Sequence, residues 1–572
     1  MTPGQHDYCT WYERTYSKLS HHGLWLRGGE INTLPPCDMA GRSFKILVTR
    51  LSTYEDTAES FTHLLLYRLA AETPGVFPDL AYLPPPKDAA IMSKDKVPWL
   101  LGTQTKLGPP AFDVVAFSNS TVLELLNIPP MLRASAVALS RRERLEHEDM
   151  PLVILGGANA VSSQLAWLGG ASAWVDGVFL GEDPAEIQKL FSLMRDLRSG
   201  GAGKPETLSE LARRVDGFFD ATEPRAVRTA ARFISTAAST RGIPVPHFPG
   251  RAGHGQIQIS EGCAHSCSFC AESWHRKPYT EKPASEILKE ALEIKASLGL
   301  WRAEVFSFNF NAHKEFAVIA EGLGRLFGRV SLKSQRMDLL AAAPRLFELE
   351  RSLGKSSFTF GVEGISRRLR KHLGKELDDE ALAKCLSLAL TRGTRELKIF
   401  LIATGHENDA DYPELDALAG SVRDLLARAG RGGARVIFSM TPLVRFAWTP
   451  LEFEDAPAPE TVSRVLSRSR TVVERAGFEF RAAASVHDYA VSQVIARAPD
   501  ASVSAAASAA LDDTGFVFYR SVSAEFFRAF TGHLGSAWPG VLTAGNARPW
   551  QALNLGIKEE VIRHRYARPQ HL

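Results

Sequence analysis

The chain has little cysteine and no long apolar run. It has six cysteines in 572 residues, and Cys9, Cys37 and Cys385 lie far apart in the sequence. This scatter does not indicate a disulfide framework. No run reaches the roughly 18 apolar residues of a membrane-spanning helix, and the start, MTPGQHDYCT, lacks the apolar core of a signal peptide. We therefore expect a protein of the reducing cytoplasm, with no membrane partner.

Net charge is also small. Lysine and arginine together number 67, against 64 aspartates and glutamates, which gives a formal net charge of +3. This balance gives no reason to expect a nucleic acid as the main partner. Apolar residues make up 45% and charged residues 23%, a composition typical of globular chains that bury a large core. The length predicts about three domains.

After an N-terminal extension (1–42), the first region alternates apolar strands with helical patterns over residues 43–200. The strands are expected at 43–51, 112–119, 151–160 and 175–184, with a helical pattern at 54–72. This alternation predicts a Rossmann-like, open parallel α/β sheet. Ligands of such sheets bind at the carboxyl ends of the strands, where Gly156, Gly157 and Gly181 fall.

A second α/β region is expected at 251–455, after a helical linker at 201–250. Its six strands are expected at 255–260, 304–310, 330–336, 356–362, 397–403 and 435–442. Helical patterns separate these strands, which predicts a partial (β/α)6 barrel with its functional groups on the loops that follow the strands. The remaining residues, 456–572, have a weaker pattern, and we expect a mixed domain that caps the substrate.

Three of the six cysteines are crowded into the loop after the first strand of this barrel. Cys263, Cys267 and Cys270 have the spacing Cys-x3-Cys-x2-Cys. Thiolates are soft ligands for zinc, copper(I) and iron–sulfur clusters. A structural zinc site needs four ligands, which His265 or His275 would complete. Three thiolates on a [4Fe–4S] cluster instead leave one iron open to a substrate or cofactor.

The cysteine spacing, its place after the first strand, and Phe269 before the last cysteine resemble the radical S-adenosylmethionine (SAM) superfamily. The resemblance implies that Cys263, Cys267 and Cys270 bind a [4Fe–4S] cluster, and that SAM binds the iron without a cysteine, here called the open iron. One departure is SFNFNAH (307–313), which stands where the superfamily often has Gly-Gly-Glu for the SAM amino group.

Three further stretches of the barrel, SQRMD (334–338), FTFGVEGISRRLRKHLGK (358–375) and TPLVRFAWTPLEF (441–453), resemble the cobalamin-associated members of the superfamily. Ser334 and Arg336 would then hold a carboxylate, and Glu363 would accept hydrogen bonds from a ribose or an amine. The alternative for each of these is an ordinary polar loop residue.

The N-terminal domain, with LGGANA and VFLGEDP at its strand ends, is similar to the cobalamin-binding domain of this group. Its glycines would let the backbone approach a large flat cofactor. The loop TRLSTYEDTAES has no histidine to bind cobalt from below, and we expect Arg68 to fill that lower face without binding the metal. A nucleotide-binding or purely structural domain, and a surface role for Arg68, are the alternatives.

Glu272 follows the last cysteine by two positions. Because a carboxylate oxygen is a competent iron ligand, Glu272 would reach the open iron and block SAM there; a solvated loop residue is the alternative. Together with Arg68 and the missing motifs, Glu272 resembles the tryptophan 2-C-methyltransferases of thiopeptide antibiotic biosynthesis, which are cobalamin-dependent. That resemblance implies polar transfer of a methyl group from SAM, through methylcobalamin, to C2 of the tryptophan indole, with an external reductant as a partner.

The reaction needs a base for the indole N–H, for which Tyr279, His313 and Asp338 are candidates by position. Three other functions stay open. One is a cobalamin-dependent radical SAM methylase that acts on an unactivated carbon through a 5′-deoxyadenosyl radical. The second is an iron–sulfur or zinc protein without turnover, and the third is an RNA methylthiotransferase.

Overall fold

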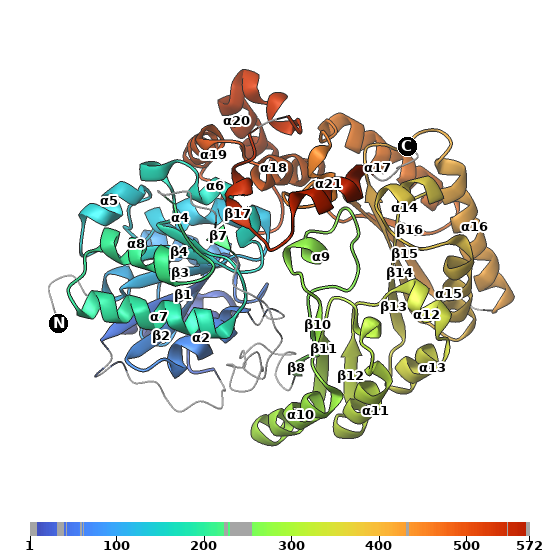
Figure 1. Ribbon diagram of the computed structural model, residues 1–572, viewed down its shortest axis with the longest axis horizontal. Helices are drawn as coiled ribbons and strands as arrows, with labels where there is room; N and C mark the ends of the chain where they lie inside the picture. Colours follow the sequence, from blue (N-terminus) through green and yellow to red (C-terminus); the bar gives the residue numbers. More distant parts are fainter. Residues whose placement is uncertain are drawn as a thin grey trace.

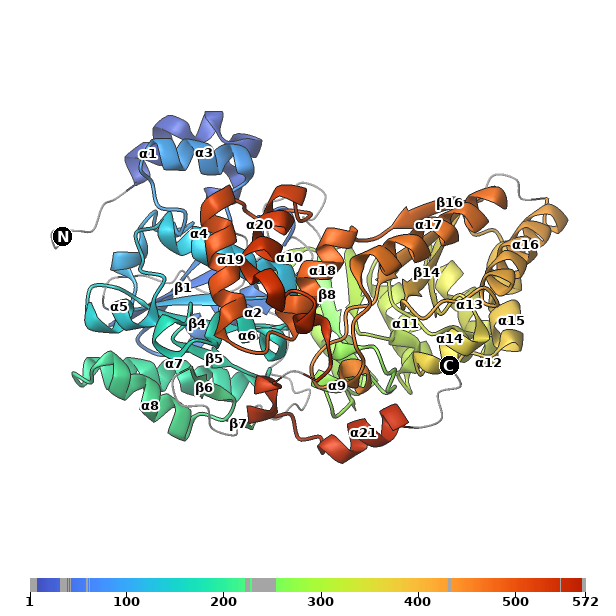
Figure 2. The same cartoon turned by 90° about the horizontal axis from the view of Figure 1, so that it is seen from above.

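The computed structural model describes residues 8–30, 39, 41, 43–57, 60, 62–221, 227–228, 254–430, 434–545 and 547–567. Every helix in this described part is too short or too polar to cross a bilayer. Two groups of parallel strands lie side by side, and the C-terminal helices cover one side of both (Figures 1 and 2). Much of the expected linker, residues 222–226 and 229–250, lies outside the described residues.

The N-terminal sheet has the strand order β2-β1-β3-β4-β5-β6, and only β6 runs antiparallel to its neighbour. Its strands are β1 (Phe44–Arg50), β2 (Val76–Tyr82), β3 (Val114–Ser118), β4 (Leu152–Gly156), β5 (Gly177–Phe179) and β6 (Phe218–Asp220). Its main helices are α2 (Thr62–Glu72), α3 (Pro86–Lys94), α4 (Ile128–Arg133), α5 (Arg141–Glu146), α6 (Gln164–Trp167), α7 (Pro184–Ser199) and α8 (Lys204–Arg214). The four strands expected from the sequence are present, and the parallel α/β fold is confirmed.

The sequence pattern missed β2, whose stretch VFPDLAY contains a proline and an aspartate. β2 is an edge strand, where the missing N–H of Pro78 costs no ladder hydrogen bond on the outer side. Asp79 is fully buried and accepts hydrogen bonds from the backbone N–H groups of Gln104 and Thr105 at 3.0 and 2.9 Å. Asp79 is thus a strand residue although aspartate is typical of loops, because a loop distant in the sequence supplies the hydrogen bonds that its buried carboxylate needs.

Two sequence-based boundaries in this domain are wrong. The helical pattern expected from Tyr54 becomes helix α2 only at Thr62, because residues 54–57 form turns. The sheet also continues beyond residue 200, since α8 packs on it and β6 pairs with β5. Three-residue strands such as β6 carry too little periodic signal to be found in a sequence.

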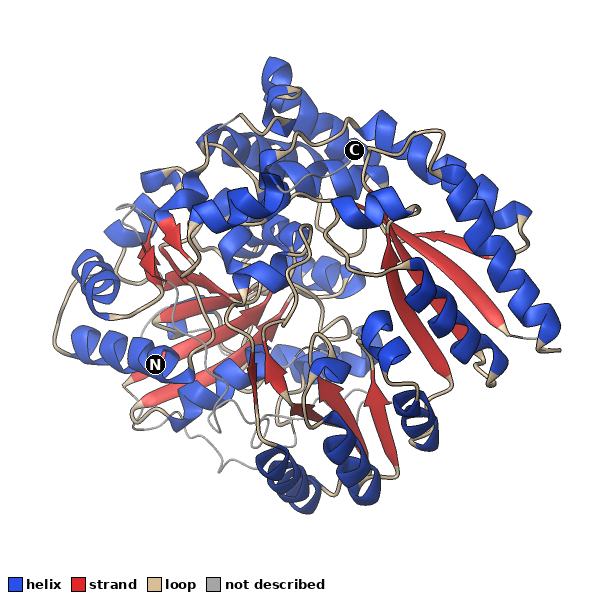
Figure 3. Ribbon diagram, turned by 45° about the vertical axis from the view of Figure 1, so that its right-hand side comes forward, coloured by secondary structure: helices blue, strands red, loops and turns tan. Residues whose placement is uncertain are grey.

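The barrel region contains two parallel sheets in the described part of the chain, and together they form a partial barrel (Figure 3). The first has the order β12-β11-β8 and the second β13-β14-β15-β16. The strands are β8 (His254–Gln258), β11 (Arg302–Phe306), β12 (Arg329–Leu332), β13 (Ser357–Glu363), β14 (Glu396–Ala403), β15 (Arg435–Pro442) and β16 (Glu479–Ala482). All six expected strands are present. β16 lies beyond residue 455, so the sheet extends into the region expected to be the cap.

Helices cover the outside of these sheets. They are α10 (Ala284–Leu298), α11 (Phe316–Leu326), α12 (Met337–Ala342), α13 (Arg345–Ser352), α14 (Arg367–His372), α15 (Asp379–Thr391), α16 (Tyr412–Arg428) and α17 (Pro459–Arg475). α17 shows why they pack there: Val462, Val465, Leu466 and Val473 are buried at helical spacing, while the arginines between them face solvent.

The C-terminal region contains α18 (Val486–Ala496), α19 (Ala501–Thr514), α20 (Ala524–Leu534) and α21 (Glu559–Ala567). α18 and α19 contact α6, and α19 also contacts α4. The alanines of the ASVSAAASAAL tract in α19 give this close approach, and Ser504 donates a hydrogen bond to the Leu165 carbonyl at 2.6 Å. The C-terminal helices therefore bind the N-terminal domain as well as the barrel.

Candidate functional site

The cysteine loop is closed at its base by a short antiparallel ladder. Strand β9 (Ser260–Glu261) precedes the cysteines, and β10 (Thr280–Glu281) pairs with it after helix α9 (Ala271–His275). Gly262 has a φ of +70°, and a Cβ there would lie 2.1 Å from the Arg276 carbonyl oxygen. Glycine is therefore required directly before Cys263, where the two ends of the loop pass each other.

Side chains within the loop bind its carbonyl groups. The Trp274 indole N–H donates to the Cys267 carbonyl at 2.9 Å, and the Ser273 hydroxyl donates to that of Cys270 at 2.9 Å. Lys277 Nζ donates to the carbonyls of Cys263 and His265 at 2.8 and 3.0 Å. These bonds hold the backbone of the three cysteines in one arrangement.

Two polar side chains from neighbouring barrel loops approach the thiol groups. Asn309 Nδ2 lies 3.2 Å from the Cys263 sulfur, and Arg336 Nη1 lies 4.0 Å from the Cys267 sulfur. Burial raises the pKa of Cys267, and it raises the pKa of Cys270 to about 12. Burial thus opposes the thiolate form, which a bound metal would stabilise, and N–H donors to sulfur are typical of iron–sulfur sites. The donor set fits a cluster held by three cysteines.

The two histidines that would complete a zinc site are placed differently. His275 Nε2 lies 2.8 Å from the Ala447 carbonyl oxygen, and so it is directed to the backbone of the loop after β15. His265 is half-buried; burial and the neighbouring Arg336 lower its pKa to about 4. The contact of His275 with the backbone disfavours the zinc alternative.

Two of the residues expected to hold SAM, Arg336 and Glu363, lie near the cysteine loop and are paired with protein side chains. Arg336 is buried and bidentate to Asp338, with Nε and Nη2 each 2.9 Å from a carboxylate oxygen. Glu363 ends β13 with a φ of +70° and pairs with Lys375 at 3.3 Å. Ser334 is exposed, and its carbonyl accepts a hydrogen bond from the Phe310 N–H at 3.0 Å. Their roles toward SAM stay predictions.

A pocket of about 370 Å³ lies between the cysteine loop and α21. Its wall includes Cys267, Trp274 and Arg336 from the barrel, and His564 and Arg565 from α21. The C-terminal helix therefore forms part of the surroundings of the cysteines, which a pattern confined to the barrel does not reveal.

Arg276, directly after α9, gathers three carboxylates that come from different elements. Its guanidinium forms ion pairs with Glu272 in α9, Glu182 after β5, and Glu261 in β9, the last at 3.4 Å. Burial opposes a charge on Arg276, but these carboxylates hold its pKa above the usual value. Glu182 belongs to the N-terminal domain, so the carboxyl end of β5 lies against the cysteine loop.

The carboxyl ends of the N-terminal strands are closed by the protein itself. Arg50, at the end of β1, pairs with Glu124 at 3.0 Å, and both are buried beside β3. This is the point where the strand order reverses, the usual ligand position of such sheets. Gly157 has a φ of +102°, and a Cβ there would lie 2.4 Å from the Asn119 carbonyl oxygen. Gly157 is therefore required by its own backbone neighbour.

The remaining residues predicted to bind cobalamin are Gly156, Gly181 and Arg68. A Cβ on Gly156 would meet its nearest atom at 3.6 Å, an ordinary contact. Gly181, next to Glu182, has a φ of +126°. Arg68 is buried in α2, with its Nε 3.8 Å from Glu72. This burial removes the surface alternative for Arg68, and its role toward cobalamin stays a prediction.

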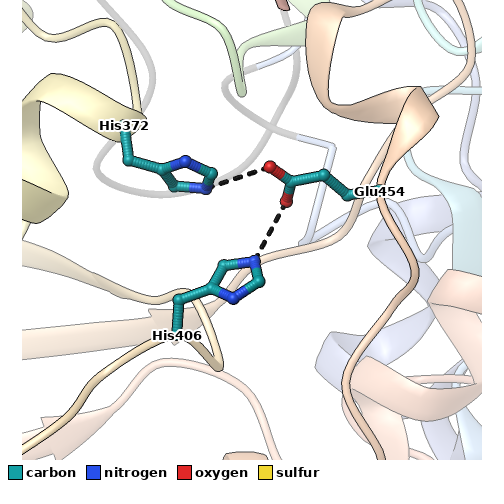
Figure 4. Close-up of side chains that lie close together, drawn as sticks. All are labelled: His372, His406 and Glu454. Carbon is teal, nitrogen blue, oxygen red and sulfur yellow. Dashed lines mark hydrogen bonds and ion pairs between the residues drawn. The ribbon is translucent and has the colours of Figure 1, made fainter. Parts of the chain in front are cut away.

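A second cluster of metal-ligand type lies at the carboxyl ends of β13, β14 and β15. His372 and His406 each place Nε2 near a different oxygen of Glu454, at 3.3 and 3.2 Å (Figure 4). Arg445 is fully buried, and it lies 3.1 Å from Glu454 and 3.2 Å from His406. Because the guanidinium already supplies the positive charge, a divalent metal ion would be repelled from this cluster.

The candidate bases are all engaged in other contacts. His313 accepts a hydrogen bond from the Glu315 N–H at Nδ1 and contacts the Lys282 carbonyl oxygen through Nε2 at 3.0 Å. Tyr279 donates to Glu281 at 2.9 Å, and burial together with this contact raises its pKa. Asp338 is paired with Arg336. The structure therefore singles out none of the three as the base.

Sequence reasoning missed Asn309, Arg276 and the Glu454 cluster. Asn309 had a usable signal, since it lies in the stretch where a Gly-Gly-Glu motif is absent. Arg276 and Glu454 had no sufficient signal, because each also needs partners that are distant in sequence: Glu182 for Arg276, and His372 and His406 for Glu454.

Two family matches cover separate parts of the chain. Residues 257–419 match the family described as Radical SAM superfamily, and residues 62–219 match Radical SAM proteins, N-terminal. The first match contains the cysteine loop and most of the barrel strands. The second contains most of the N-terminal sheet.

Among curated proteins, the ribosomal protein uS12 methylthiotransferase RimO of Chlorobium phaeovibrioides is 41% identical over 80 residues, which is 14% of this chain and 17% of that protein. The tRNA-2-methylthio-N(6)-dimethylallyladenosine synthase of Bordetella petrii is 24% identical over 217 residues, 37% of each chain. The chain thus spans less than half the length of these curated relatives.

Among solved structures, the radical SAM methyltransferase TsrM from Kitasatospora setae, with cobalamin and a [4Fe–4S] cluster bound, matches with 14% identity and a TM-score of 0.44 over 70% of this chain and 75% of TsrM. The cobalamin-dependent SAM radical enzyme OxsB matches with 13% identity and a TM-score of 0.46 over 75% of this chain and 56% of OxsB. With TM-scores below 0.5, these likenesses support no assignment of activity.

Proposed function

We infer the function of this chain from its radical SAM domain at residues 257–419 and from the N-terminal sheet whose strand end lies against that domain. It is a methyltransferase that uses a [4Fe–4S] cluster, SAM and cobalamin. The methyl group passes from SAM through cobalamin to C2 of the indole of tryptophan. The observation that carries the use of two cofactors is the pairing of Glu182 with Arg276, which joins the carboxyl end of β5 to the cysteine loop.

The cluster part of this proposal rests on the cysteine loop. Cys263, Cys267 and Cys270 hold the cluster, and the bonds from Trp274 and Lys277 keep the loop backbone in place. Asn309 donates its amide N–H to the Cys263 sulfur, which stabilises the thiolate form. When bound, SAM supplies the methyl group, and cobalamin supplies a metal that accepts and releases it.

The cobalamin part rests on the N-terminal sheet. Five parallel strands in the order β2-β1-β3-β4-β5 end on the side where Glu182 contacts the barrel. The buried pair of Arg50 and Glu124 fills the crevice at the strand reversal, so a large cofactor would lie over the strand ends, between the two domains. Arg68 would then face the lower side of the cofactor and keep water away.

Glu272 decides between polar and radical transfer in this proposal. The structure pairs Glu272 with Arg276; released from that pair, the carboxylate would bind the open iron and block the position where SAM is cleaved reductively. We therefore expect methyl transfer without 5′-deoxyadenosine. A methylase that acts on an unactivated carbon forms 5′-deoxyadenosine in proportion to its product, so this by-product separates the two functions.

The test is an assay of the reconstituted protein with tryptophan, SAM, cobalamin and a reductant, read by mass spectrometry. Methylated tryptophan and S-adenosylhomocysteine are expected, without 5′-deoxyadenosine. Stoichiometric 5′-deoxyadenosine would refute the polar mechanism. No methylated tryptophan would refute the substrate, while iron, sulfide and cobalamin analyses of the same sample would still test the cofactors.

A methylthiotransferase is a second candidate function, because the short stretch similar to the Chlorobium protein reaches 41% identity. Such an enzyme adds sulfur as well as a methyl group to a macromolecule. Mass spectrometry of ribosomal protein and tRNA incubated with the reconstituted protein would show an added methylthio group if this function is correct. We expect none.

A further inference from the structure

The group around Arg276 contains more negative than positive side chains. One guanidinium contacts Glu182, Glu261 and Glu272, and it lies over the Phe308 ring at 5.3 Å from the ring centroid. Arg276 is 8% exposed, so this charge balance is set largely away from water. A single guanidinium has enough donors for two carboxylates at once. One of the three can therefore leave while Arg276 stays paired.

Glu272 is the carboxylate best placed to leave. Its side chain is 39% exposed, against 26% for Glu182 and 10% for Glu261. Glu261 is also held from its other oxygen by Gln258, which donates at 2.6 Å. Glu272 lies in the first turn of α9, whose N-cap is Cys270, so its backbone is fixed to the cysteine loop.

We propose that Arg276 is a positioning residue for Glu272, holding it off the open iron, and that Glu182 of the N-terminal domain sets how strongly Arg276 holds it. The proposal rests on the proposed function, in which Glu272 is able to bind that iron. When Glu182 pairs closely with Arg276, less of the guanidinium charge acts on Glu272, and the carboxylate is released toward the cluster. Contact between the two domains thereby controls access of SAM to the iron.

Glu182 and Arg276 act in opposite directions on SAM binding, which makes the proposal testable. The experiment titrates SAM into the reconstituted full-length protein and follows the change in the electron paramagnetic resonance signal of the reduced cluster. Arg276→Lys keeps the charge but loses the guanidinium Nε that contacts Glu272. We expect half-saturation at a SAM concentration roughly tenfold higher than in the wild type.

Glu182→Gln leaves Arg276 more strongly attached to Glu272, so we expect SAM to bind about threefold more tightly. Glu186→Gln is the matched control. It also removes one negative charge, but Glu186 lies in α7 and pairs with Lys189. We expect no change in SAM binding. In a Glu272→Gln background, both Arg276→Lys and Glu182→Gln should have no effect. Equal effects with and without Glu272 would overturn the proposal, as would an unchanged titration in Arg276→Lys.

The experiment distinguishes failure of the proposed function from failure of the role proposed for Arg276. If SAM changes the cluster signal in no variant, the SAM-dependent function is wrong. Mössbauer spectra of the clusters without SAM then still report the ligand of the unique iron. A larger carboxylate-bound fraction in Arg276→Lys would support the positioning role, and an identical spectrum would overturn it.

Discussion

The N-terminal sheet and the barrel sheets use the carboxyl ends of their strands differently. In the N-terminal domain, the strand reversal is filled by the buried pair of Arg50 and Glu124, and Gly157 packs against the backbone of Asn119. In the barrel, the corresponding ends carry the cysteine loop and Asn309. A glycine at a strand end is therefore explained first by backbone packing, whereas chemistry needs side chains with donor atoms.

The largest effect is expected from a substitution in the cysteine loop of the barrel. Cys263→Ala removes one of the three proposed cluster ligands, so we expect loss of the cluster and of all cluster-dependent activity. Iron and sulfide analysis with the absorbance spectrum measures this. Cys9→Ala, in α1 (Cys9–Thr15), is the matched control and should keep the full iron content. Retention of a complete cluster in Cys263→Ala would contradict the assignment.

On the N-terminal side, Glu124→Ala should mainly affect stability. It leaves the Arg50 guanidinium buried with a lost partner, and it removes the acceptor for the Ser52 hydroxyl. We expect the free energy of unfolding to fall by about 3–5 kcal/mol, measured by denaturant titration. Arg133→Ala, which breaks an exposed pair with Asp512, should cost less than about 1 kcal/mol. Similar decreases in the free energy of unfolding in the two variants would show that the buried pair stabilises the fold no more than the exposed pair does.

In the barrel, the buried carboxylate of Glu454 forms a structural ion pair. Burial raises the pKa of Glu454, but His372, His406 and Arg445 outweigh it and hold the pKa well below its usual range. A carboxyl group with a lowered pKa stabilises the fold above its unfolded pKa of about 4.3. That contribution is lost as the pH falls further, through the folded pKa.

Glu454→Gln should therefore lower the free energy of unfolding by about 1.5–3 kcal/mol at pH 7. The difference from the wild type should shrink below pH ~4. Thermal unfolding at a series of pH values measures this. A difference that is constant across the acid range would show that the charge of Glu454 is not what stabilises the cluster.

The smallest expected change in stability comes from substituting the two adjacent glycines at the end of β4. Gly157→Ala forces a left-handed conformation on alanine and a close approach to Asn119, at a cost of about 1–2 kcal/mol. Gly156→Ala meets only ordinary contacts and should change stability by less than about 0.5 kcal/mol. Denaturant titration of both variants, together with their cobalamin content, separates backbone packing from cofactor binding. A loss of cobalamin in Gly156→Ala alone would restore a cofactor role to that residue.

Much of the fold was predictable because long apolar strands and amphipathic helices have strong periodic signals. The six barrel strands and β1, β3, β4 and β5 were found in this way. β2 and β6 were not, since one contains a proline and the other has three residues. The cysteine triplet was also predictable, because its three ligands lie within eight residues of one another.

The sequence by itself determined the two α/β regions and the cysteine loop, since each depends on residues close together in the chain. Only the tertiary structure decided what surrounds that loop. Arg276 meets Glu182 across a separation of more than ninety residues, and α21 reaches the cysteines from the C-terminal region. Such contacts leave no local pattern, because the partners are brought together by the packing of one domain against another.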